Sequence, residues 1–106
     1  MLDFYLINDA TPRPNAGTKG LEHAGGIEHE TFEYLQTAGI MEAWLDYYKG
    51  FRWTKDQVAK KILTINESMN AKNEFTTRLL KVLTKANDTD NGLIAYGDWL
   101  YLAPNT

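Results

Sequence analysis

The hydrophobic residues of this chain fall into short runs and helical stripes, and these predict strands and helices in alternation. Residues 2–7 read LDFYLI and are followed directly by Asn8 and Asp9. Because this bulky run is too short for an independent helix, it predicts a strand. Residues 11–20 contain two prolines and two glycines, a composition that breaks regular structure and predicts a long loop.

Three amphipathic stretches predict helices. Residues 27–38 place apolar side chains on one side at helical spacing, and Gly39 follows as a typical helix stop. Thr54 and Gln57 are spaced as in a capping box, which predicts that a helix begins there. The apolar stripe that follows, and a second stripe over residues 75–86, predict either two packed helices or one long bent helix.

Residues 40–53 carry the densest group of aromatic side chains, and their pattern is ambiguous. It fits a helix that ends before Gly50, and it also fits two short strands around a Lys-Gly turn, because periodicity over so few residues does not separate the two. We favour a short helix as far as Tyr48, followed by an extended segment over residues 51–53.

Two apolar runs, residues 93–96 and 99–102, flank Gly97 and Asp98 near the end of the chain. Such a pair between two runs favours a two-residue turn, so we expect a carboxyl-terminal hairpin. Together with the amino-terminal strand, this predicts an α+β fold in which about three helices pack on a small, mostly antiparallel sheet. The length of 106 residues predicts one globular domain over residues 1–106.

The composition is that of an ordinary soluble globular protein, with 43% hydrophobic and 24% charged residues. The chain contains no cysteine, which excludes disulfides, thiolate metal sites and cysteine nucleophiles, and fits a reducing compartment. The first seven residues lack the basic start and long apolar run of a signal peptide. No apolar stretch approaches the roughly 20 residues that a membrane span needs. We therefore expect a cytoplasmic, bacterial-type protein without a membrane partner.

Charge is sorted by position along the chain. Residues 1–50 hold eight acids and three bases, whereas residues 52–85 hold eight bases and three acids. A folded domain with one acidic and one basic region has a dipolar field that orients it toward a charged partner. This pattern predicts a charged partner without naming it.

The residues that could carry catalysis or bind a metal form no diagnostic set. His29 and Glu33 have the spacing that lets two ligands meet on one helical face, but a zinc site needs three or four. Glu30 and Glu33 lie on the predicted polar face, whereas a catalytic acid needs a partly buried setting. We therefore predict no catalytic residue, metal site or cofactor. A small enzyme of unknown reaction remains an alternative, and it requires a pocket where residues 11–20 converge with His23 or His29.

A basic strip on the last predicted helix makes nucleic acid a second alternative partner. Arg78, Lys81 and Lys85 lie on one flank of this helix, where they could follow phosphates. The net charge of −3 and the pI of about 5.3 argue against this, since nucleic-acid-binding domains are usually basic. A solvated helix face is therefore the favoured interpretation of the strip.

Recognition of another protein is the function that conflicts least with the sequence. The segment from residue 44 to residue 53 combines large aromatic anchors with charged neighbours, as protein interfaces do, although about half of the anchors must belong to the core. We therefore predict a small, non-enzymatic interaction domain, such as an inhibitor or immunity-type protein, whose acidic half covers a basic surface of its partner. The candidate binding residues are Trp44, Asp46, Tyr47, Tyr48, Arg52 and Trp53.

Overall fold

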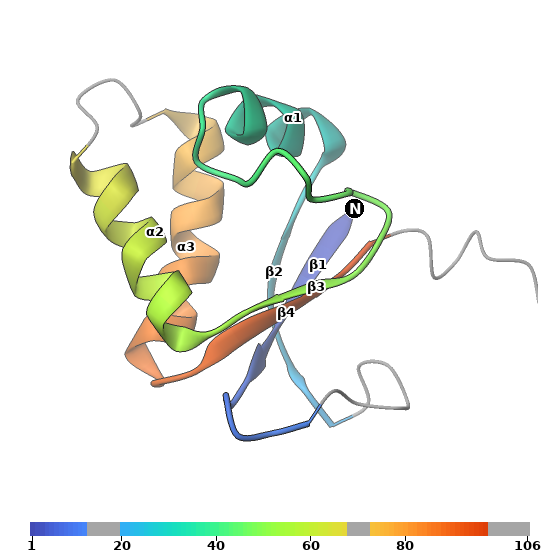
Figure 1. Ribbon diagram of the computed structural model, residues 1–106, viewed down its shortest axis with the longest axis vertical. Coiled ribbons are helices and arrows are strands. Elements are labelled where there is room, and N and C mark those ends of the chain that lie inside the picture. Colours follow the sequence, from blue (N-terminus) through green and yellow to red (C-terminus); the bar gives the residue numbers. More distant parts are fainter. Residues whose placement is uncertain (13–19, 68–72, 98–106) are drawn as a thin grey trace, which may run out of the picture.

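The computed structural model describes residues 1–12, 20–67 and 73–97. Within these ranges the strands form one antiparallel sheet in the order β2-β1-β4-β3 (Figure 1). This arrangement of three helices and four strands confirms the predicted α+β class. In chain order the elements are β1 (Leu2–Ile7), β2 (Glu22–Ile27), α1 (His29–Thr37), β3 (Phe51–Trp53), α2 (Lys55–Glu67), α3 (Glu74–Asp88) and β4 (Gly92–Tyr96).

β1 is an inner strand, and its side chains alternate between the two faces of the sheet. Leu2, Phe4 and Leu6 are buried in the main core, where they meet the apolar side chains of the helices. Ile7 points to the opposite face and packs there in a smaller cluster with Ile94 of β4. Successive side chains of a strand point to opposite faces of the sheet. The side chains that meet the described helices are those of one face, so these helices cover that face.

α2 and α3 lie side by side against the sheet, and α1 packs near α3 (Figure 1). The hydroxyl of Thr54 accepts from the N–H of Gln57 at 3.2 Å, while the side chain of Gln57 accepts from the N–H of Thr54 at 2.8 Å. This exchange confirms the predicted capping box. Asn73 and Thr76 make the same exchange at the start of α3, so a second helix begins there. The two apolar stripes therefore belong to two helices, α2 and α3, which pack on each other.

The segment before α1 is a strand, which the sequence pattern does not predict. Ile27, expected as the first helical residue, is the last residue of β2, and Gly25 pairs with Phe4 of β1. A β-carbon on Gly25 would lie 2.9 Å from a methyl group of Val82, and the residue has φ of +146°. Glycine therefore lets α3 pack closely on β2. The low strand propensity of glycine explains why the sequence pattern does not predict this strand.

The short helix expected in residues 40–48 does not form, and turns and bends take its place. Gly39 follows α1 with φ of +78°, which confirms the predicted helix stop. The N–H groups of Ile40 and Met41 then both donate to the carbonyl of Leu35, at 2.9 and 3.1 Å. These bonds close the carboxyl end of α1 and leave residues 40 and 41 outside a regular helix.

The predicted extended segment over residues 51–53 is confirmed as β3, which pairs with β4. The first expected strand of the carboxyl-terminal hairpin is β4, and it has β1 on one side and β3 on the other. The second expected hairpin strand, residues 99–102, lies outside the described residues. Most of the expected loop over residues 11–20 lies outside them as well.

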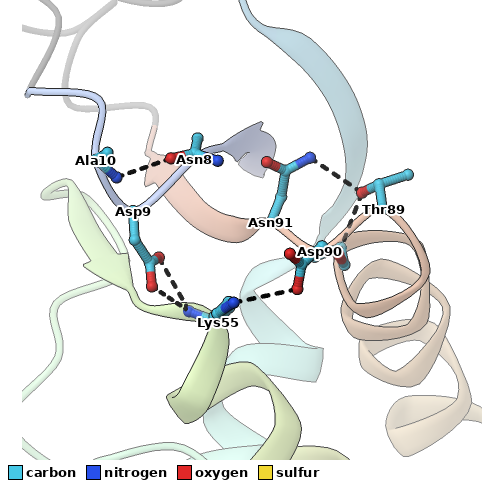
Figure 2. Close-up of polar contacts among 8 residues, drawn as sticks. Asn8, Asp9, Ala10, Lys55, Thr89, Asp90 and Asn91 are labelled. Atoms are coloured by element: carbon cyan, nitrogen blue, oxygen red, sulfur yellow. Dashed lines mark hydrogen bonds and ion pairs between the residues drawn. The ribbon is translucent and has the colours of Figure 1, made fainter.

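A cluster of polar contacts joins the end of β1 to the starts of α2 and β4 (Figure 2). The Asp9 carboxylate accepts from the backbone N–H of Lys55 at 3.0 and 3.3 Å, so the amino terminus of α2 is capped from a distant part of the chain. The Lys55 side chain pairs with Asp90 at 3.3 Å. Arg52 donates to the backbone carbonyls of Asn8 and Asp9 at 2.9 and 3.3 Å. These contacts fix the turn after β1 against α2.

Candidate functional site

The segment from residue 40 to residue 50 joins α1 to β3 and presents large aromatic side chains to solvent. Trp44 is 82% exposed and Tyr48 is 43% exposed. Trp44 is the most exposed of the large hydrophobic side chains that the structure describes. An indole carries a large apolar surface, and folding leaves this one in water.

The same segment is anchored by residues that point inward. Ile40, Met41 and Tyr47 are buried in the main core, and Leu45 packs against it. The Tyr47 ring meets the Phe32 ring edge-on at 5.5 Å, and its hydroxyl donates to a backbone carbonyl of β2 at 3.4 Å. Residues on both sides of Trp44 are therefore fixed, although Trp44 itself adds nothing to the core.

Gln36 of α1 holds the backbone of this segment. Its side-chain amide donates to the carbonyl of Glu42 at 3.0 Å and to that of Leu45 at 2.9 Å. A longer contact of 3.5 Å reaches the carbonyl of Ala43. At helical spacing Gln36 falls on the same polar side of residues 27–38 as Glu33, but the structure shows it half-buried under the segment.

Lys61 of α2 holds the segment from the other side, and it is only 9% exposed. Its ammonium group donates to the carbonyl of Ile40 at 3.3 Å and to the carboxylate of Glu42. It also lies 4.6 Å from the centre of the Trp53 ring, within the range of a cation–π interaction. The second carboxylate oxygen of Glu42 is buried and has no hydrogen-bond partner among the described residues.

Two acidic residues are linked to the exposed Tyr48, Asp46 directly and Glu33 through His29. Asp46 accepts from the N–H of Tyr48 at 2.8 Å, and the Tyr48 ring lies 5.8 Å from the ring of His29. His29 in turn lies 2.6 Å from Glu33, so the predicted pairing along α1 is present. Residues 28–50 together contain five carboxylates and one lysine. We call this group the Trp44 surface; it consists of Trp44, Asp46, Tyr48, His29 and Glu33.

Three of the predicted binding residues do not belong to the Trp44 surface. Tyr47 and Trp53 are core residues, and the Trp53 ring stacks on that of Phe4 at 5.7 Å. Arg52 is held by the turn after β1, away from residues 40–50. This corrects the predicted surface, because a partner cannot reach Tyr47 or Trp53 without unfolding the core. Trp44, Asp46 and Tyr48 remain.

The charge sorting along the sequence is partly cancelled in space. Lys61 pairs with Glu42, and Lys85 pairs with Glu22 at 3.2 Å, so ion pairs join the basic half to the acidic half. Glu28 and Glu30, at the start of α1, make no ion pair with the described residues. Asp46 and the start of α1 therefore keep unpaired acidic charge, as do Asp56, Glu67 and Asp88 on α2 and α3 among the described residues.

The predicted basic strip is largely engaged with its own chain. Arg78 donates to the Thr31 hydroxyl at 3.2 Å and lies 3.9 Å from Glu74, while Lys85 is paired with the start of β2. Lys81 makes no ion pair within the described ranges; it lines a shallow groove along α3. The strip thus offers phosphates less free charge than its sequence indicates.

The structure does not bring the two histidines together. His23 lies on β2, 3.0 Å from Asp3, whereas His29 lies on α1. Neither the groove along α3 nor the pocket beside Lys61 is lined by a histidine. Within the described ranges, no three histidine, aspartate or glutamate side chains are placed to share a metal ion.

None of the described helices is both long and apolar enough to cross a bilayer.

The candidate site consists of the exposed aromatic side chains, their acidic neighbours, and Gln36 and Lys61, which hold the segment. Comparison of the chain with known protein families, with curated proteins and with solved structures gives no match.

Proposed function

We propose that this protein is a non-enzymatic binding domain that uses the Trp44 surface to recognise a basic surface of another protein. The observation that carries the proposal is Trp44 itself, which is 82% exposed on a segment whose fold is secured by other residues. Trp and Tyr are the residues most often found to dominate binding energy at protein interfaces. Covering Trp44 would bury apolar surface that folding leaves exposed.

The sign of the partner's charge follows from the residues around Trp44. Asp46 and Glu33 lie on the Trp44 surface, and Glu28 and Glu30 extend the acidic region along α1. A rim of one sign steers a partner of the opposite sign and disfavours partners of the same sign. A protein with exposed lysines and arginines therefore fits best. An inhibitor that covers a basic functional surface of its partner matches the acidic charge of this region. The cytoplasmic location stays a prediction.

The proposal is tested with a photo-crosslinking amino acid placed at position 44. A matched control carries it at position 63, because Leu63 is 56% exposed on α2, outside the Trp44 surface. Nuclease-treated lysate of the native host supplies the partner. We expect one crosslinked protein from position 44, none from position 63, and loss of the product in the Asp46→Lys variant. The captured protein, once purified, must bind the chain at a fixed stoichiometry and less tightly as salt is raised.

Three results would overturn the proposal. Equal crosslinking from positions 44 and 63 would mean that Trp44 has no special role. A crosslinked dimer of the chain would replace the foreign partner with a second copy. A product that disappears after nuclease treatment would transfer the function to nucleic acid and to Arg78, Lys81 and Lys85.

A further inference from the structure

We infer that Gln36 and Lys61 are positioning residues that hold the segment around Trp44 in one conformation before any partner arrives. The consequence for affinity rests on the proposed function, whereas the ordering of the segment can be tested without a partner. Between them, the two side chains bind the carbonyl groups of Ile40, Glu42, Ala43 and Leu45. These carbonyls belong to a segment without regular secondary structure, which has no ladder of its own to satisfy them.

Gln36 suits this task because its amide group has two N–H donors and carries no charge. The contacts at 3.0 and 2.9 Å use both donors on carbonyls that lie on either side of Trp44 in sequence. A glutamate would turn two acceptors toward these carbonyls, and a methionine would fill the space without donating. The contacts therefore depend on the amide and not only on the size of the side chain.

Lys61 acts through Glu42, which lies two residues before Trp44. An ammonium group buried to this degree requires compensation, and here Glu42, the Ile40 carbonyl and the Trp53 ring supply it. A buried ion pair is weak as a source of stability, and we infer that its role here is to specify one arrangement of the groups that make it. The second oxygen of Glu42 has no partner among the described residues, so the contact with Lys61 is what keeps this carboxylate inside.

Order in this segment would favour binding. A loop that is already in its bound conformation loses less entropy when a partner covers it than a loop that must be ordered during association. We expect release of the segment to weaken binding by about tenfold, mainly through faster dissociation. The Trp44 side chain itself would be unchanged in such a variant, so a loss of affinity would report on its placement.

The test measures backbone ¹⁵N relaxation of residues 42–48 in the wild type and in Gln36→Met, a substitution that keeps length but removes both donors. The wild type should give order parameters near ~0.85 for these residues, and the variant should give values that fall toward ~0.6. The double variant Lys61→Met/Glu42→Gln, which leaves no unpaired buried charge, should show the same direction of change. Asp9→Ala is the control, because it removes backbone hydrogen bonds at the far turn in Figure 2.

Unchanged order parameters in a folded Gln36→Met protein would overturn the inference, whatever Trp44 binds. A fall of the same size in Asp9→Ala would also overturn it, since general loss of stability would then explain the result. If the segment loosens but the partner binds as tightly as before, the effect on affinity is refuted. If Trp44→Ala also leaves binding unchanged, the proposed function fails, while the ordering of the segment by Gln36 stands.

Discussion

The ammonium group of Lys61 lies 4.6 Å from the centre of the Trp53 ring and turns inward. This contact places a lysine of α2 in the core, although its sequence neighbour Lys60 is solvent-exposed. From there Lys61 reaches Glu42 and the backbone of the segment that carries Trp44. One residue of the basic half of the sequence thus helps to shape the candidate binding site in the acidic half.

Trp44→Ala should leave the fold intact, whereas Trp53→Ala should damage it. Substitution of an exposed side chain typically changes the free energy of unfolding by no more than about 0.5 kcal/mol. Removal of a buried aromatic side chain costs about 3–5 kcal/mol, and Trp53 is only 2% exposed. Chemical denaturation followed by circular dichroism measures both values. Similar losses of stability in the two variants would contradict the assignment of Trp44 to the surface.

Gly25→Ala should destabilise the protein more than Gly39→Ala. Both glycines have positive φ, so both substitutions strain the backbone. A β-carbon at position 25 would also lie 2.9 Å from Val82, whereas nothing lies within 4 Å of one at position 39. We expect about 1–3 kcal/mol of additional loss at position 25 from overpacking. Thermal melts of the two variants measure the difference, and Val82→Ala in the Gly25→Ala background should recover part of it; failure to recover would place the strain elsewhere.

Asp9→Ala should reduce stability by about 0.5–2 kcal/mol, the usual cost of losing a helix cap. The carboxylate accepts from the first backbone N–H of α2, and no other described side chain takes its place there (Figure 2). Asp9→Asn keeps one oxygen acceptor while it loses the charge and the second acceptor, so it should retain most of the stability. Urea titrations of the two variants make the comparison. Equal losses would show that the charge, and not the hydrogen bond, is what matters.

Lys61→Met alone should lower the free energy of unfolding more than Lys61→Met combined with Glu42→Gln. The single change leaves the Glu42 carboxylate partly buried without its cation. Breaking a fully buried ion pair costs about 3–5 kcal/mol of stability. Because Glu42 is partly exposed, we expect a loss at or below the lower end of that range. The double change removes both charges. A double-mutant cycle on the free energy of unfolding would measure the coupling between the two residues. A coupling near zero would show that the ion pair does not hold this segment.

Local signals in the sequence were sufficient for much of the fold. The capping box from Thr54 to Gln57 is a contact between residues three apart, so it can be recognised without knowledge of the rest of the chain. The strand over residues 2–7 is similarly marked by its own composition. β2 is different, because Gly25 gains its role from the close approach of α3, and Gly26 from the close approach of Met1 and Asp3, which are tertiary contacts. Strand propensity cannot detect such a contact.

The candidate site was predicted only in part, for a related reason. The density of aromatic residues indicates the segment that holds Trp44 and Tyr48, but exposure depends on which side chains the core accepts. Tyr47 meets Phe32 and is buried, while Tyr48, the next residue, is exposed. Gln36 and Lys61 could not be recognised, because each acts on backbone carbonyls that the fold brings to it. The position of Lys61 between Val58 and Ile65 at helical spacing, on the apolar stripe of α2, was the one available signal.

The affinity of the purified partner for the wild type, Trp44→Ala and Leu63→Ala decides whether Trp44 anchors the interface. Both substitutions remove an exposed hydrophobic side chain, so their effects on stability should be alike. If Trp44 anchors the interface, Trp44→Ala should weaken binding by at least about thirtyfold, the ~2 kcal/mol expected of a dominant interface residue. Leu63→Ala should change the affinity by less than about threefold, as expected of a residue outside the interface. Wild-type affinity in Trp44→Ala, measured by calorimetry on a folded protein, would contradict the account.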